Sequence, residues 1–160
     1  MKLLVCAVGH RMPAWVAAGF NDYARRMPRE SPIELIEIRP QARPSKPLNP
    51  AEVERLLNAE AQRIRAALPA GCRTVALDEH GKSYATAEFA RLIQGWMREG
   101  GDTAFVIGGA DGLQSRLRRD ASLQLSLSPM TLPHQLVRVL LAEQLYRAIS
   151  LLHRHPYHRE

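Results

Sequence analysis

The stretch LLVCAVGHRMPAWVAAGFNDYARRMPRESPIELIEI, residues 3–38, places a longer segment between two short runs rich in apolar residues. Residues 3–8 and 33–38 are rich in Leu, Val and Ile, which favours β-strands. Residues 14–26 have the length and the spacing of apolar side chains that are typical of a helix. This part of the chain therefore predicts a strand, a helix and a second strand in succession.

The same alternation continues along the rest of the sequence. We expect further strands at residues 74–77, 103–107 and 123–127, and further helices at residues 51–67, 86–98, 113–119 and 136–153. Such alternation predicts an α/β fold, with a mostly parallel sheet and helices on both faces. The chain has 160 residues, of which 46% are hydrophobic. We therefore expect residues 1–160 to form a single domain with its own core.

Composition narrows the class of protein. Residues 3–8 are too short an apolar run for a secretory signal, and no stretch approaches the roughly 18 apolar residues of a membrane helix. Cys6 and Cys72 are too few and too far apart for a zinc ribbon or a redox pair, which favours a cytoplasmic protein. The net charge is +6, from 22 Lys and Arg against 16 Asp and Glu. An arginine-rich basic chain is typical of RNA-binding proteins and also of GC-rich genomes, so both explanations stay open.

Ligands of parallel sheets bind beyond the carboxyl ends of the strands, which directs attention to three loops. These are LDEHGKS at 77–83, IGGADG at 107–112 and LSPMTLPHQ at 127–135. HGKS is not a phosphate-binding P-loop, because position 76 is Ala76 where that motif needs a glycine. IGGADG lacks the dinucleotide-binding spacing. Its three glycines, Gly108, Gly109 and Gly112, allow either a close approach of backbone to a flat ligand or a plain turn.

The third loop interleaves apolar residues at 127, 130 and 132 with Ser128 and Thr131, and two prolines stiffen it. Apolar side chains beside free backbone amides suit an adenine ring. The alternative is structural, because Pro133 also suits the first turn of the last helix.

The last predicted helix has a broad apolar arc with Arg138 in its middle. A buried arginine must reach the surface, find a partner or face a cavity that holds an anionic or carbonyl-rich ligand. The opposite side of this helix is also partly apolar, because it carries Leu136, Leu140 and Leu151. We expect the sheet to cover one side and a second subunit the other.

Three segments together, IGGADG, LSPMTLPHQLVRVLLAEQLYRA and the terminal HPYHRE, resemble one family. They are similar to the RlmH-type ribosomal RNA pseudouridine N3-methyltransferases of the SPOUT superfamily. The similarity extends to AVGHRMPAWVAAGFNDYARRMP near the start and to ELIEI in the second predicted strand.

This resemblance implies an α/β fold with a C-terminal trefoil knot, a homodimer, and S-adenosylmethionine (S-adenosyl-L-methionine) as cofactor. The implied substrate is a pseudouridine in large-subunit (23S) ribosomal RNA, accepted within an assembled ribosome. Two alternatives stay open: a SPOUT enzyme that acts on tRNA or another rRNA site, and a non-catalytic ribosome-binding module. Carried over by position, the cofactor-binding residues are Leu77, Asp78, Gly108, Gly109, Leu127, Ser128, Pro129, Met130, Thr131 and Leu132.

Our hypothesis for catalysis uses the end of the chain. His158 is the preferred base for the N3 proton, because imidazole titrates near neutrality. Arg159 would hold a phosphate or the developing uridine anion, and Tyr157 would contact the nucleobase. Arg138 would reach in from the last helix. His153, His155 and His158 have no spacing that suits a metal, so no metal is expected.

Overall fold

The computed structural model describes residues 1–157 and contains one five-stranded sheet in which every pair of neighbouring strands is parallel. The strand order is β2-β1-β4-β3-β5. The strands are β1 (Leu3–Val8), β2 (Ile33–Ile38), β3 (Arg73–Ser83), β4 (Thr103–Ile107) and β5 (Leu123–Ser126). The strands β1, β4 and β3 lie inside the sheet; every residue of β1 and β4 is buried, whereas β3 is buried only at Val75 and Ala76.

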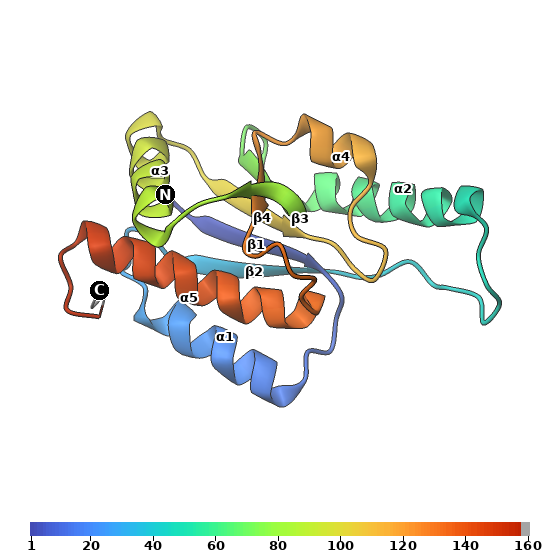
Figure 1. The fold of residues 1–160 in the computed structure, drawn as a ribbon, viewed down its shortest axis with the longest axis horizontal. Helices are drawn as coiled ribbons and strands as arrows, with labels where there is room; N and C mark the ends of the chain where they lie inside the picture. The colour runs from blue at the N-terminus through green and yellow to red at the C-terminus, as the bar shows by residue number, and fades with distance from the viewer. Residues whose placement is uncertain (158–160) are drawn as a thin grey trace.

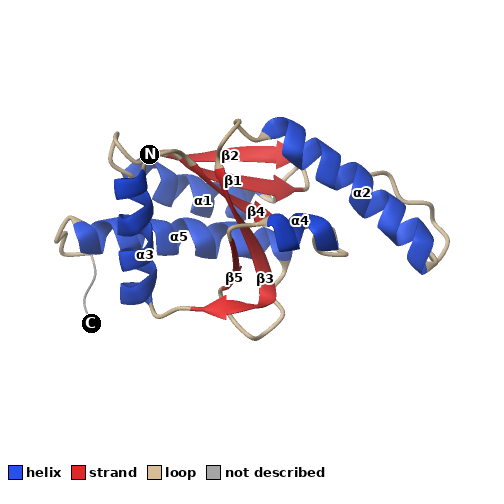
Figure 2. Cartoon of the chain, turned by 90° about the horizontal axis from the view of Figure 1, so that it is seen from above, coloured by secondary structure: helices blue, strands red, loops and turns tan. Residues whose placement is uncertain are grey.

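Helices cover both faces of the sheet, as Figures 1 and 2 show. They are α1 (Ala14–Arg26), α2 (Pro50–Ala67), α3 (Thr86–Glu99), α4 (Ser115–Asp120) and α5 (His134–Leu152). On one face, Phe20 of α1, Ile93 of α3 and Leu145 of α5 pack in one core with Phe105 of β4. On the other face, α2 and α4 pack on Cys6, Val8 and Val106 through Ala61, Ile64 and Leu117. The predicted α/β fold with helices on both faces is confirmed.

The first strand, helix and second strand have the predicted bounds. The other helices differ from the expected bounds by one or two residues at either end. Asn49 and Glu52 fix the start of α2, because each side chain accepts a hydrogen bond from the backbone N–H of the other residue. Within the described residues, none of the helices has the length and apolarity needed to cross a membrane.

The third strand differs most from the prediction. We expected it to end at residue 77 and LDEHGKS to be a loop, but β3 continues to Ser83. Leu77 and Lys82 both pair with Leu125 of β5, and Ser83 then pairs with Ser126. The residues between Leu77 and Lys82 therefore bulge out of the ladder, which hides the strand from a pattern based on alternation.

Gly81 lets the chain return from this bulge to β5. A Cβ atom at Gly81 would lie 2.6 Å from the carbonyl oxygen of Gln124 and 2.7 Å from its carbonyl carbon. Both are backbone atoms of a paired strand, which cannot move aside without breaking the ladder. The close approach of β3 and β5 therefore requires glycine at this position.

Replacing Gly81 with alanine should lower the free energy of unfolding by about 1–3 kcal/mol, because the new methyl group overlaps the backbone of β5. Gly95→Ala in α3 is the matched control, since a Cβ there meets nothing within 4 Å. The control should raise stability by up to about 1 kcal/mol, as expected for alanine in a helix. Urea unfolding of both variants measures the difference, and equal stability would contradict the close approach.

Candidate functional site

A cavity of about 890 Å³ lies at the carboxyl ends of β3, β4 and β5. Its walls come from the β3 bulge, the loop between β4 and α4, the loop between β5 and α5, and the start of α2. Of the ten predicted cofactor-binding residues, only Pro129 is not on its wall; the others are Leu77, Asp78, Gly108, Gly109, Leu127, Ser128, Met130, Thr131 and Leu132. Three segments far apart in sequence thus meet around one space.

The loop after β4 is a tight turn. The backbone N–H of Gly112 donates to the carbonyl of Gly109 at 3.0 Å, and Gly112 has a φ of +74°. A Cβ at Gly108 would lie 2.4 Å from the carbonyl carbon of Gly112 and 2.5 Å from its oxygen. The turn itself therefore requires Gly108, and its bare backbone forms part of the cavity wall. A plain turn and a close approach of backbone to a ligand, the two explanations considered for these glycines, are therefore compatible.

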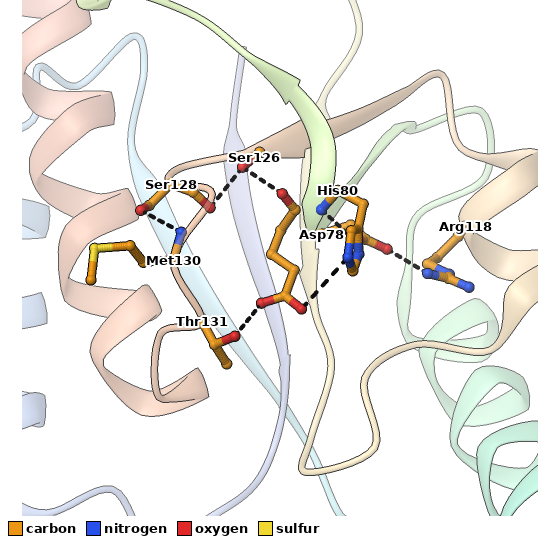
Figure 3. A network of polar contacts seen from close by, with 8 residues as sticks. Asp78, His80, Arg118, Ser126, Ser128, Met130 and Thr131 are labelled. Carbon is orange, nitrogen blue, oxygen red and sulfur yellow. Dashed lines mark hydrogen bonds and ion pairs between the residues drawn. The ribbon is translucent and has the colours of Figure 1, made fainter.

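Asp78 is held at the cavity wall by two basic residues (Figure 3). Arg118 Nη1 of α4 donates to Asp78 Oδ2 at 2.5 Å, while the backbone N–H of His80 donates to Oδ1 at 2.8 Å. The Asp78 side chain is only 8% exposed. Burial by itself would raise the pKa of Asp78, but the hydrogen bonds from Arg118 and His80 outweigh it, so the pKa lies below its usual value.

The loop after β5 is shaped by hydroxyl groups, as Figure 3 shows. The backbone N–H of Met130 donates to Ser128 Oγ at 3.0 Å, and Thr131 Oγ1 donates to Glu79 Oε2 at 2.6 Å. Ser126 Oγ lies 2.9 Å from the carbonyl oxygen of Ser128 and 3.1 Å from that of Glu79. The side chain of Met130 is 73% exposed, so the tip of this loop faces outward.

Arg138 finds protein partners and does not line the cavity. It is 1% exposed, and its guanidinium donates to Glu37 Oε2 at 3.1 Å and to the carbonyl of Gly9 at 3.0 Å. The start of α5 is thereby tied to the carboxyl ends of β1 and β2. Burial, and then the charge of Arg138, lower the pKa of His134 on the cavity wall, which favours the neutral form of its imidazole.

Tyr157 lies against α5, away from the cavity. Its ring packs on Tyr146 with the centroids 4.6 Å apart, and its hydroxyl donates to Glu143 Oε1 at 3.3 Å. Burial, and then the hydrogen bond with Tyr23, raise the pKa of Tyr157 to about 12. These contacts lie at Glu143 and Tyr146 of α5, whereas the cavity borders the first turn of this helix through His134 and Val137. The structure therefore does not bring Tyr157 and Arg138 together within one chain.

The other two predicted catalytic residues, His158 and Arg159, lie outside the described residues. Among residues 1–157, no three His, Cys, Asp or Glu side chains gather as metal ligands would. Sequence reasoning missed Glu79 and Arg118 as parts of the site. Glu79 follows Leu77 and Asp78 in LDEHGKS, but only those two residues were carried over from the resemblance. Arg118 is one of three arginines in a short helix where nothing sets it apart.

A parallel sheet with a glycine turn and a cavity at its carboxyl edge defines an α/β protein that binds a small organic ligand. The family model described as "Predicted SPOUT methyltransferase" matches residues 1–158. The chain belongs to this family of methyltransferases. Membership also implies the C-terminal trefoil knot that the resemblance predicts.

Curated relatives agree with this family, and one solved structure agrees with the fold. "Ribosomal RNA large subunit methyltransferase H" of Nitrosospira multiformis is 61% identical over 99% of both chains. The protein of the same name from Ralstonia pickettii is 57% identical over the same shares. A structure of "a probable methylase family protein" from Haemophilus influenzae Rd KW20 matches with a TM-score of 0.51 and 13% identity. It covers 99% of this chain and 70% of that one, and it supports the fold alone.

Replacing Arg118 with methionine should lower the free energy of unfolding at pH 7 by about 1–2 kcal/mol, because Asp78 would stay buried with its charge less well compensated. The folded pKa of Asp78 lies below its usual 3.8, so the stabilisation is complete above that value and is lost as the pH falls through the lowered pKa.

Urea unfolding at pH 7 and pH 3 measures this effect, with the exposed Arg119→Met as the control of equal charge. The difference in free energy of unfolding between Arg118→Met and this control should be smaller at pH 3 than at pH 7. A deficit independent of pH would contradict the assignment to Asp78.

Proposed function

We propose that this protein transfers a methyl group from S-adenosylmethionine to N3 of a pseudouridine in large-subunit ribosomal RNA. The observation that carries the proposal is the 61% identity, along almost the whole chain, to a protein named for methylation of large-subunit rRNA. The basic charge of +6 fits a polyanionic substrate. One domain formed by residues 1–160 would act in the cytoplasm, where ribosomes are assembled.

The methyl donor is S-adenosylmethionine, and the cavity has the chemistry to hold it. Leu77, Leu127 and Leu132 supply apolar walls for an adenine ring. Gly108 and Gly109 offer backbone without side chains, in a turn that any Cβ at Gly108 would disrupt. The carboxylate of Asp78 is occupied by Arg118 and His80, so it shapes the wall and is not a free acceptor. The bound donor supplies an electrophilic methyl group.

The protein's own part in the reaction is to align the acceptor and to help it lose a proton. In this proposal His158 accepts the N3 proton, Arg159 binds a phosphate or the developing anion, and Tyr157 contacts the nucleobase. Arg138 holds the first turn of α5 in place, because its guanidinium binds Glu37 and Gly9. A neutral imidazole suits this chemistry near pH 7 as the proton acceptor, since the imide proton of the pseudouridine is only weakly acidic.

A homodimer would bring the tail and the cavity together. Tyr157 contacts Glu143 and Tyr146 of α5, while the cavity borders the first turn of this helix. A second copy that packs on α5 could place its tail at the cavity of the first. Leu140 of α5, 37% exposed, and Trp15 of α1, 63% exposed, are apolar side chains that such a copy would cover.

The acceptor is tested by offering S-adenosylmethionine with a labelled methyl group to assembled ribosomes, isolated large subunits and naked rRNA. We expect label on pseudouridine N3, identified by the mass of the nucleoside, and we expect it only with assembled ribosomes. Donor binding with no label on any acceptor would favour tRNA as the substrate. A protein whose melting temperature the donor does not raise would instead be a ribosome-binding module.

Deleting residues 157–160, or fusing a tag after Glu160, should abolish methyl transfer while donor affinity and the oligomeric state stay nearly unchanged. The reason is that the tail is proposed to supply groups for the acceptor and none for the donor. The same tag placed before Met1 is the control. Calorimetric titration with the donor and a methyl-transfer assay separate the two effects, and full activity after truncation would refute the role of the tail.

A further inference from the structure

Glu79 joins the β3 bulge to the loop between β5 and α5 at two points. Its side chain accepts a hydrogen bond from Thr131 Oγ1 at 2.6 Å. Its backbone carbonyl lies 3.1 Å from Ser126 Oγ, at the end of β5. In Figure 3 one dashed line from Ser126 and another from Thr131 mark these two contacts. One residue of the bulge thus holds the beginning and the end of residues 126–131.

The bond between Glu79 and Thr131 restrains a loop that has few other restraints. Within the described part of the chain, it is the only hydrogen bond that joins residues 128–132 to a segment other than β5 and α5. A hydroxyl that donates to a carboxylate makes a stronger bond than one between neutral groups. The Glu79 side chain is 38% exposed, so water weakens this bond without removing it.

The same bond changes the part that Thr131 can play. Its hydroxyl proton is directed to Glu79, so it is not directed to a ligand in the cavity. While this bond is made, the hydroxyl has no proton to offer a ligand, and what the bond fixes is the position of the Thr131 backbone. That position depends on Glu79, because Thr131 has no other side-chain bond in the described structure.

We propose that Glu79 is a positioning residue for the methyl donor: by holding Thr131 it keeps residues 127–132 in the shape that binds S-adenosylmethionine. This inference rests on the proposed function of the cavity. The contact affects donor affinity and the rate of donor release. We expect the chemical step to be unchanged once the donor is bound, because the proposal assigns both side chains to holding the donor-binding loop.

Global stability depends on other contacts. The ladder between β3 and β5 is held by backbone pairing of Leu77 and Lys82 with Leu125, and of Ser83 with Ser126. Removing the Glu79 carboxylate leaves this pairing intact. The effect of a substitution should therefore appear in donor binding and loop protection, and hardly in the melting temperature.

The test compares Glu79→Ala, Thr131→Val and the double variant, each titrated calorimetrically with S-adenosylmethionine. We expect each single variant to bind the donor about fivefold more weakly, as the loss of one such hydrogen bond implies. The double variant should bind no more weakly than either single variant, because the two changes remove the same contact. KM for the donor should rise in parallel, with kcat on the acceptor unchanged at saturating donor.

Two conservative variants are the matched controls. Thr131→Ser keeps the hydroxyl and Glu79→Gln keeps an acceptor oxygen, so both should bind the donor within about twofold of the parent protein. If Glu79→Gln is as weak as Glu79→Ala, the charge of Glu79 matters and not its contact with Thr131, which overturns the proposal. Additive losses in the double variant would overturn it too.

Amide hydrogen exchange of the donor-bound protein gives an independent readout. Exchange in residues 127–132 should be faster in Glu79→Ala, while exchange in β1 and β4 stays unchanged. Donor binding by the parent protein distinguishes a failure of the proposed function from a failure of the role of Glu79. Failure of the parent to bind S-adenosylmethionine would overturn the proposed function, whereas normal binding by both the parent and Glu79→Ala would overturn only the role of Glu79.

Discussion

Leu125 of β5 pairs with two residues of β3, Leu77 and Lys82, and the chain between those two residues must leave the sheet. The rest of the cavity depends on this constraint. It turns Asp78 toward α4, where Arg118 binds it, and it turns Glu79 toward the loop after β5. A regular strand would alternate these residues across the sheet and leave the three loops without a connection.

Two deeply placed ion pairs hold helices α4 and α5 to the ends of the strands. Arg118 binds Asp78 beside the cavity, and Arg138 binds Glu37 at the end of β2. In each pair one partner is nearly buried, with Asp78 8% and Arg138 1% exposed, so neither charge could remain there alone. These pairs specify where each helix begins or lies relative to the sheet, which apolar packing alone leaves less sharply defined.

The sequence predicted the alternating architecture because strands and helices have buried apolar residues, such as Leu3, Val5 and Phe105, whose burial can be inferred from their apolar side chains. It also predicted which loops surround the cavity, because the carboxyl ends of parallel strands meet at one edge. The bulge of β3 escaped prediction, since it arises from pairing with Leu125, more than forty residues away. For the same reason Arg118 looked like any surface arginine until its partner was known. The family itself came from resemblance, which spacing and periodicity could not supply.

The order of strands in the sheet differs from their order in the chain, and this affects how the protein matures during its own synthesis. β4 lies between β1 and β3, and β5 pairs only with β3, so the sheet closes late in translation. The helix α5 then packs against α1, which was made first. A nascent chain that extends only as far as β4 lacks the wall that residues 127–137 form. The polypeptide therefore gains the ability to bind a ligand there only after β5 and residues 127–137 have been made.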